Sequence, residues 1–196
     1  MVLTENDRKV LRLLAVSFAK YYSINNIAKV IGVAPNGAYK ILKKFEKEGV
    51  LKAEHIANIK THKLNFENEK TLRVLELAFM PKELEGKIKS RAGDLQRLKS
   101  LTKACIIFGS YITTKKEPGD LDILFILAKS QYPLYKTVLE KVQEIVPIKI
   151  QDVVQTVDDL QKNLKKEDPI IVEALCNGVI LWGSGVLVKV IKNVHK

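Results

Sequence analysis

Hydrophobic residues recur at helical spacing in three segments of the first third of the chain. The first segment follows Thr4, a residue type that favours the N-cap of a helix. The second begins at Ser23 and ends at Gly32, and the third opens at Pro35 and ends at Gly49. Proline is common in the first turn of a helix and glycine just beyond its end. The pattern predicts three helices, the last two separated by a tight turn.

After Gly49 the pattern becomes extended. Residues 51–56 and 59–66 alternate apolar and polar side chains around a turn at 57–58, which predicts a β-hairpin. Residues 69–103 return to a helical, charge-rich pattern interrupted by proline and glycine. We interpret this last segment as a helical connector and a candidate dimerisation element.

The second half of the chain alternates short apolar runs with helical stretches. The runs at 104–108, 120–127 and 148–154 predict strands, and residues 134–145 predict a helix. Asp158 is predicted to cap a further helix. The chain is therefore expected to be of the α+β class, with an N-terminal domain at 1–68, the connector at 69–103 and a C-terminal domain at 104–196.

Charge is distributed unevenly along the 196 residues, whose formal net charge is +11. Residues 1–68 carry 12 Lys/Arg against 6 Asp/Glu, whereas residues 104–196 carry 12 against 11. An excess of positive charge suits a polyanionic partner of the N-terminal domain. Lysine enrichment also marks heat-adapted proteins, so charge alone leaves both interpretations open.

Several classes of protein are not expected. The longest apolar runs are too short to cross a bilayer, and the first residues lack the pattern of a signal peptide, so we expect a cytoplasmic protein without a membrane partner. Cys105 and Cys176 lie among apolar neighbours, which predicts reduced thiols. The three histidines are scattered, and no structural zinc is expected.

The third predicted helix has a polar outer face. Its apolar stripe is available to pack on the first helix, and the polar side chains are left outside. Asn36 can form paired hydrogen bonds with adenine. Lys40, Lys43 and Lys44 can neutralise phosphates or reach guanine, and Tyr39 lies beside them. The alternative is a solvated lysine-rich face used for contacts with protein.

The segment from Ile27 to Leu51 resembles winged-helix regulators of the MarR and ArsR type, and the resemblance covers about residues 4–66. It implies a winged helix-turn-helix domain that binds double-stranded DNA. The third helix would enter the major groove, and the hairpin would contact the backbone or the minor groove. It also allows a homodimer that reads paired half-sites.

A second group of residues indicates phosphate chemistry. Gly109 and Ser110 follow an apolar strand, where glycine lets a phosphate approach the backbone and Ser110 can donate a hydrogen bond at an expected helix N-terminus. Asp120 and Asp122, two apart on the next strand, point to one side and can share hard divalent cations. Two such ions can clamp the attacking and leaving oxygens of a displacement reaction.

This arrangement resembles the minimal nucleotidyltransferases of the DNA polymerase beta superfamily over about residues 104–185. The resemblance implies a small mixed sheet flanked by helices, two Mg²⁺ ions, and an NTP, most often ATP, bound at Gly109 and Ser110. It implies a third carboxylate on a neighbouring strand, best matched by Asp152, that binds metal and serves as or orients the base. Asp158 and Asp159 compete for that role but fit helix capping better.

Two positions depart from the family pattern. Thr113 stands where a second glycine is usual, and Gly119 replaces a serine before the first metal-binding aspartate. Neither position is a metal ligand. Lys115 and Lys116 suit a solvated loop, with contact to a triphosphate or a substrate as the alternative.

Two main functions follow from these resemblances, and a weaker third is that the winged helix binds RNA and the chain modifies RNA ends. The first is a metal-dependent enzyme that transfers a nucleoside monophosphate to a hydroxyl of a protein or an RNA, in the manner of antitoxins that modify a separate HEPN-type toxin. The second is a transcriptional regulator whose nucleotidyltransferase-like domain binds nucleotide without turnover. Transfer of label from ATP separates the two.

Overall fold

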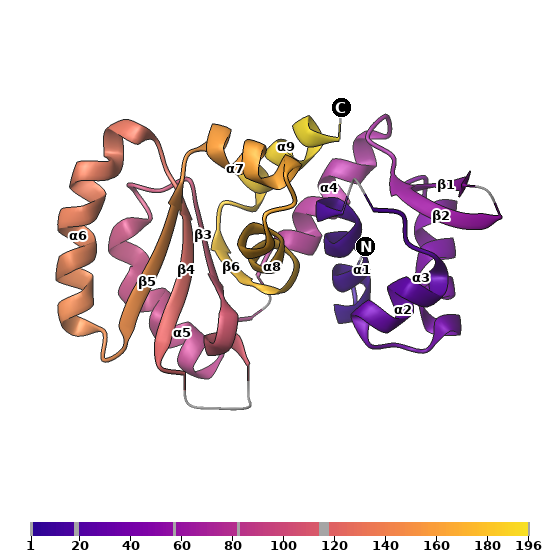
Figure 1. Ribbon diagram of the computed structural model, residues 1–196. Helices are drawn as coiled ribbons and strands as arrows, with labels where there is room; N and C mark the ends of the chain where they lie inside the picture. Colours follow the sequence, from indigo (N-terminus) through magenta and orange to yellow (C-terminus); the bar gives the residue numbers. More distant parts are fainter. Residues whose placement is uncertain (1, 18–19, 57, 82, 114–117, 196) are drawn as a thin grey trace. The chain divides into compact units, whose positions relative to one another are not determined.

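The computed structural model describes residues 2–17, 20–56, 58–81, 83–113 and 118–195. The chain belongs to the α+β class and divides into two compact units (Figure 1). Unit 1 comprises residues 1–79 with 195–196, and unit 2 comprises residues 80–194. The division lies inside the predicted connector 69–103, between residues 79 and 80.

The described residues of unit 1 form four helices and one hairpin. In chain order these are α1 (Glu5–Val16), α2 (Ile24–Ile31), α3 (Pro35–Lys47), β1 (Leu51–Ile56), β2 (Ile59–Leu64) and α4 (Glu69–Phe79). Thr4 and Asp7 form a capping box at α1, and the Ser23 hydroxyl caps α2. Gly32 ends α2 with a φ of 75°, a backbone conformation that glycine adopts without strain. The predicted helices and hairpin are confirmed, with Ala57 of the turn outside the described residues.

The apolar stripes of the unit 1 helices meet in one core. Buried members of α1 and α3 lie against each other, and α2 and α4 add to the same core. Its fully buried side chains include Leu11, Ile27, Leu42, Phe45, Leu75 and Phe79. Because α3 buries these apolar positions, its polar side chains are left on the opposite face.

Unit 2 is a sheet with helices on both faces. In chain order its elements are α5 (Gly86–Asp94), η1 (Leu95–Leu98), β3 (Ala104–Phe108), η2 (Gly109–Ile112), β4 (Asp120–Ile126), η3 (Lys129–Gln131), α6 (Tyr132–Ile145), β5 (Lys149–Gln155), α7 (Val157–Lys165), α8 (Pro169–Asn177), β6 (Val179–Trp182) and α9 (Ser184–Val194). The strand order is β5-β4-β3-β6. Strands β4 and β5 are parallel, and β3 is antiparallel to both β4 and β6, so the sheet is mixed as expected.

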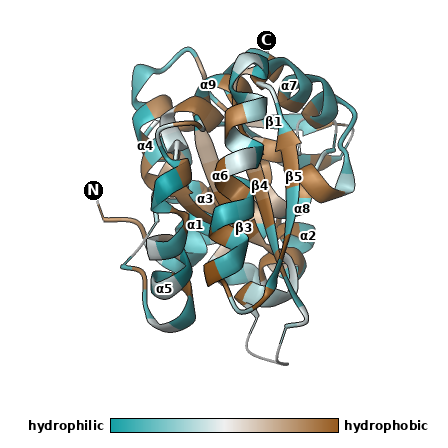
Figure 2. Cartoon of the chain, turned by 90° about the vertical axis from the view of Figure 1, so that its left-hand side faces the viewer, coloured by the Kyte–Doolittle hydropathy of each residue, from teal (hydrophilic) through white to brown (hydrophobic). Residues whose placement is uncertain are grey.

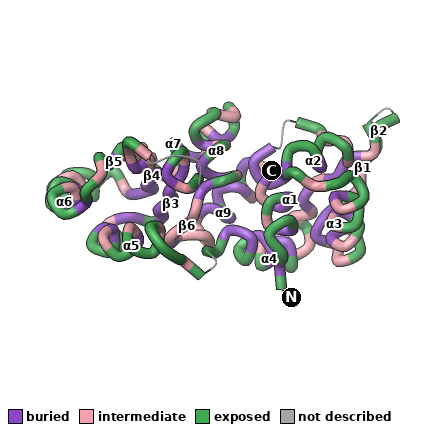
Figure 3. Tube along the Cα trace, turned by 90° about the horizontal axis from the view of Figure 1, so that it is seen from below, coloured by how far each residue is buried: buried purple, intermediate pink, exposed green. Residues whose placement is uncertain are grey.

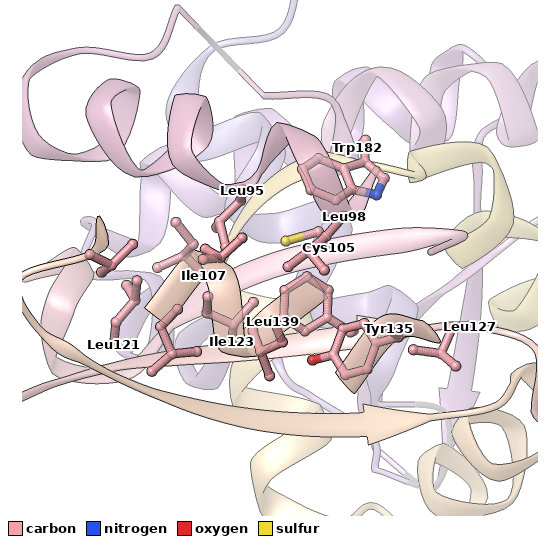
Figure 4. Packing of buried hydrophobic residues seen from close by; sticks show 14 of the residues in the cluster. Leu95, Leu98, Cys105, Ile107, Leu121, Ile123, Leu127, Tyr135, Leu139 and Trp182 are labelled. Atoms are coloured by element: carbon pink, nitrogen blue, oxygen red, sulfur yellow. The ribbon is translucent and has the colours of Figure 1, made fainter. Parts of the chain in front are cut away.

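Alternation along the strands assigns each side chain to one face of this sheet. Odd-numbered residues of β3 and β4 join a cluster that also contains η1 and α6, including Tyr135 and Leu139 (Figure 4). The even-numbered residues face the other side, where α8 packs on β3 and α7 contacts α8 and α9. Figure 2 shows β4 as a largely hydrophobic strand, and Figure 3 shows that β3 and β4 are buried. Whether a residue of β3 or β4 has an odd or an even number therefore decides on which face of the sheet its side chain lies.

One helix cap differs from the prediction. Helix α7 is capped by Thr156, whose hydroxyl accepts a hydrogen bond from the Asp159 amide at 3.1 Å, and Asp159 completes the capping box. Asp158 lies in the first turn and is exposed. Threonine is the better cap here because its position leaves the next acidic residues in the first turn, where the helix dipole favours them.

Neither Cys105 nor Cys176 forms a disulfide. Among the residues with described positions, no helix has the length and apolar character needed to cross a membrane.

Candidate functional site

Gly109 and Asp122 lie together at the end of β3. Phe108 pairs with Asp122 in the sheet register, so the chain leaves β3 beside that carboxylate. Gly109 has a φ of 69°, and a Cβ built on it would collide with Asp122 Oδ2. A glycine is therefore required here both by conformation and by space. The backbone at Gly109 and the side chain of Asp122 form one edge of the candidate site.

Ser110 occupies a shorter helix than expected. Residues Gly109–Ile112 form a 3₁₀-helix of 4 residues, and the Ser110 carbonyl accepts hydrogen bonds from the amide and the hydroxyl of Thr113. The side chain of Ser110 is exposed beside the site. The Ser110 hydroxyl is therefore available as a hydrogen-bond donor. The longer helix that was expected to attract an anion with its N-terminus does not form at these four residues. Lys115 and Lys116 lie outside the described residues.

Asp120 and Asp122 point to the same face of β4, as predicted. Both carboxylates are partly exposed on the face opposite α6. Gln151 pairs with Asp122 in the parallel register of β4 and β5, and it therefore shares that face. Its side-chain amide donates a hydrogen bond to Asp120 Oδ2. The pair of carboxylates is thus accompanied by an amide from the neighbouring strand.

The electrostatics of Asp122 favour a cation nearby. Burial raises the pKa of Asp122, and the negative charges of Asp120 and Glu173 raise it further. Glu173 lies on α8 and is exposed. Like charges that crowd one carboxylate are relieved when a divalent cation binds between them.

A pocket of about 520 Å³ opens at this edge of the sheet. Its walls come from the end of β3, from β4, from the edge strand β5 and from α8. Its lining residues with polar or special backbone chemistry are Gly109, Asp122, Lys149, Gln151, Asp152 and Glu173. The pocket therefore combines carboxylates, one lysine and an open turn of backbone.

The prediction that Asp152 joins Asp120 and Asp122 is wrong. Asp152 pairs with Ile123, so its side chain emerges on the α6 face of the sheet. There its Oδ2 accepts hydrogen bonds from Tyr135 Oη at 3.0 Å and Lys136 Nζ at 2.9 Å. Within the part of the chain that the structure describes, no three His, Cys, Asp or Glu side chains form a group able to hold a metal ion.

Gln151 and Glu173 were not identified from the sequence. The alternation in β5 could have identified Gln151. Apolar Ile150 and Val154 pack in the core and lie on the same face of the strand as Asp152, so Gln151 must lie on the other face, with Asp122. No comparable local pattern identifies Glu173, because α8 is distant from β4 in the sequence.

The outer face of α3 carries the predicted polar residues in unit 1. Asn36, Tyr39, Lys40 and Lys43 are exposed. Asn36 and Tyr39 also line a hollow of about 580 Å³ that reaches the tip of the hairpin. Its other walls are the first turn of α2 and residues of the turn and β2, namely Ser23, Ile24, Asn25, Pro35, Asn58, Ile59 and Lys60. The helix and the hairpin thus contribute to one concave surface.

Lys44 does not belong to this outer face. Its ammonium group binds the buried carboxylate of Asp7 at 2.7 Å and lies 4.9 Å from the centre of the Phe45 ring. Asp7 also completes the capping box of α1, whose N-cap is Thr4. The ammonium group of Lys44 is therefore engaged in the contact between α1 and α3, at a position where the sequence predicted a contact with DNA.

A single carboxylate joins α3 to β2. Glu46 accepts from Lys43 at 3.1 Å, Lys60 at 3.4 Å and His62 at 3.4 Å. The hydrogen bond from Lys43 is the main cause that lowers the pKa of Glu46, whereas burial lowers the pKa of His62. Glu46 therefore offsets the charge of Lys60, which lines the concave surface, and of Lys43 on the outer face of α3.

Replacing Glu46 with glutamine is expected to strengthen binding to duplex DNA. Lys43 and Lys60 lose their shared anion and become free to neutralise phosphates, so affinity should rise several-fold and its dependence on salt should steepen by about one to two in log–log slope. Fluorescence anisotropy with a labelled duplex over a salt series measures both quantities.

Glu48→Gln is the matched control for this variant. It removes the same charge from unit 1, but Glu48 binds Lys70 and contacts neither Lys43 nor Lys60. An equal gain of affinity in both variants would mean that net charge alone is responsible and that the Glu46 contacts are irrelevant.

Comparisons of the chain with known protein families, with curated proteins and with solved structures found no match. What the two surfaces can bind therefore follows from their own chemistry. Unit 1 presents a basic, concave face, and unit 2 presents paired carboxylates beside a glycine turn.

Proposed function

We propose that the chain is a DNA-binding regulator whose second unit binds a magnesium–nucleoside triphosphate without transferring its nucleotidyl group. The position of Gln151 carries this proposal. It shares a sheet face with Asp120 and Asp122, where the resemblance to nucleotidyltransferases calls for a third carboxylate. An amide cannot accept the proton of an incoming hydroxyl at neutral pH.

Unit 1 supports the DNA-binding part of the proposal. The exposed side chains of α3 include an amide able to recognise adenine and lysines able to neutralise phosphates. The first turns of α2 and α3 border the same hollow, and backbone N–H groups at helix N-termini favour phosphate oxygens. The arrangement fits a winged helix-turn-helix in which α3 enters the major groove and the hairpin is the wing.

The residues of unit 2 fit one magnesium ion better than two. Mg²⁺ is commonly held by one or two carboxylates together with substrate phosphates, and Asp120 and Asp122 provide that pair. When bound, the ion would neutralise phosphate charge. Lys149 lines the pocket, and exposed Ser110 follows Gly109 in the turn, so both would be donors for phosphate oxygens.

A transferase remains the second candidate function. The observation in its favour is Glu173 on α8, whose negative charge raises the pKa of Asp122. In a transferase Glu173 would be the third carboxylate, carried by a helix where the family has a strand. In that case a nucleoside monophosphate, most simply from ATP, would pass to a hydroxyl of a protein or an RNA. A separate HEPN-type toxin is the partner that the resemblance implies for such an enzyme.

Incubation with ATP labelled at the α-phosphate, Mg²⁺, and protein and RNA acceptors tests the proposal. We expect label to be retained by the protein without covalent transfer and to be released intact on denaturation. Covalent label on an acceptor that is lost in the double variant Asp120→Asn/Asp122→Asn would overturn the regulator and support the transferase.

A further inference from the structure

A second pocket of unit 2 lies away from Asp120 and Asp122. It has a volume of about 770 Å³, within the usual range for small-molecule sites. It is enclosed by the ends of β4 and β5, the first turns of α6 and the first turn of α7. The lining residues are Leu127, Lys129, Tyr132, Lys136, Asp152, Val154, Gln155, Thr156, Asp158 and Asp159.

The topology of the sheet favours a ligand at this place. Strands β4 and β5 are parallel neighbours, so their carboxyl ends meet at the pocket. Helix α6, which follows β4, packs on one face of the sheet, whereas α7, which follows β5, contacts α8 and α9 on the other. A crevice at the carboxyl ends of parallel strands whose helices diverge in this way is the usual ligand site of open α/β sheets.

Asp152 is one of the residues that line the pocket. Tyr135 and Lys136 both donate to its Oδ2. Among the described residues no donor reaches Oδ1, although the carboxylate is mostly buried, with a side-chain exposure of 17%. Because its position is fixed by these two bonds, Oδ1 is a preorganised acceptor for a ligand N–H group.

An aromatic ring stands beside this acceptor. Tyr132 is 44% exposed, and its ring stacks on that of Tyr135 with centroids 6.3 Å apart. Leu127 and Val154 supply apolar surface in the same pocket. A planar ligand could therefore stack on Tyr132 while one of its edges donates to Asp152.

The charges of the pocket favour an uncharged ligand. Lys136 is neutralised by Asp152, and Asp159 is occupied by the cap of α7. Lys129 and Asp158 remain exposed and opposite in sign. A free phosphate would meet the carboxylates and a free ammonium group would meet the lysines, whereas neutral hydroxyl groups can bond to both.

We propose that this pocket binds a nucleoside whose base carries an exocyclic amino group. The base stacks on Tyr132, its amino group donates to Asp152 Oδ1, and the ribose hydroxyls bond with Lys129 and Asp158. Asp152 on the edge strand β5 borders both pockets, but the other residues that line this one differ from those around Asp122, so the two sites are distinct. The inference does not depend on the proposed function, since a nucleoside has no phosphate and needs no metal.

Equilibrium dialysis of the full chain with labelled adenosine, cytidine and uridine, in buffer containing EDTA, tests the proposal. We expect saturable binding of one adenosine or cytidine per chain, and weaker binding of uridine, whose carbonyl oxygen would face the Asp152 carboxylate. Tyr132→Ala should weaken binding about 5- to 150-fold, the loss expected for one base–aromatic stack. Tyr132→Phe keeps the ring and should keep most of the affinity.

Leu134→Ala is the matched control, because Leu134 is 53% exposed on the same helix but does not line the pocket. Absence of saturable binding by adenosine and cytidine would overturn the proposal, as would unchanged affinity in Tyr132→Ala. The proposal would also be overturned if Asp120→Asn/Asp122→Asn lost nucleoside binding while Tyr132→Ala bound as tightly as the unchanged chain. That result would place the base beside Asp120 and Asp122.

Discussion

The double variant Asp120→Asn/Asp122→Asn is expected to lose magnesium-dependent ATP binding by at least about 100-fold. The reason is that both carboxylates proposed to hold the ion become neutral amides. Loss of a single outer-shell partner of a metal already lowers its affinity about 10- to 100-fold, so removal of both ligands should cost more. Isothermal titration with Mg²⁺ and a non-hydrolysable ATP analogue measures this loss.

Asp152→Asn tests whether Asp152 takes part in magnesium binding, as the sequence predicted, or lies apart from the metal on the α6 face. Asp152 lies on the α6 face with Tyr135 and Lys136, so its replacement should leave Mg²⁺–ATP affinity unchanged. Its thermal stability should fall, because Lys136 loses a charged partner that is mostly buried. A loss of nucleotide affinity as large as that of the double variant would contradict the assignment of the two sheet faces.

Lys40→Ala with Lys43→Ala is expected to weaken duplex DNA binding about tenfold more at 50 mM salt than at 200 mM. The salt dependence should flatten by about 1.8 in log–log slope, because each phosphate contact contributes about 0.9. Both side chains are exposed on α3. The charge of Lys43 is already partly neutralised by Glu46, so loss of Lys40 should account for the larger part of the affinity lost. Anisotropy titrations at several salt concentrations measure the slope directly.

Lys44→Ala removes a charge from the same helix but from a different environment. Lys44 binds Asp7, so this variant should lose stability while its salt slope stays close to that of the unchanged chain. If Lys40→Ala/Lys43→Ala binds duplex DNA as tightly as the unchanged chain at every salt concentration, α3 is used for protein contacts.

Most elements were predictable because their signals are local. Thr4, Ser23 and Gly32 end or begin helices through contacts made within the same turn, and these positions were predicted correctly. The pairing of Asp120 with Asp122 also needs only the alternation of one strand. Such features require no knowledge of which distant segment lies beside them.

The Asp158 cap was a local error, whereas two other errors concern contacts between distant segments. Whether Gln151 or Asp152 meets Asp122 depends on the register of β5 against β4, and a shift of one residue exchanges the faces. The alternation of Ile150, Asp152 and Val154 would have favoured the observed register, but the family resemblance favoured an acidic residue. Lys44 was misassigned for a related reason, since its partner Asp7 lies on another helix.

The most direct measurement is a crystal structure of the full chain with Mg²⁺ and a non-hydrolysable ATP analogue. We expect the metal to bind Asp120 and Asp122, with the triphosphate against Gly109 and Ser110 and with Gln151 still bonded to Asp120 or to the ligand. A nucleotide bound elsewhere, or a site at which these two carboxylates hold neither metal nor phosphate, would contradict the account.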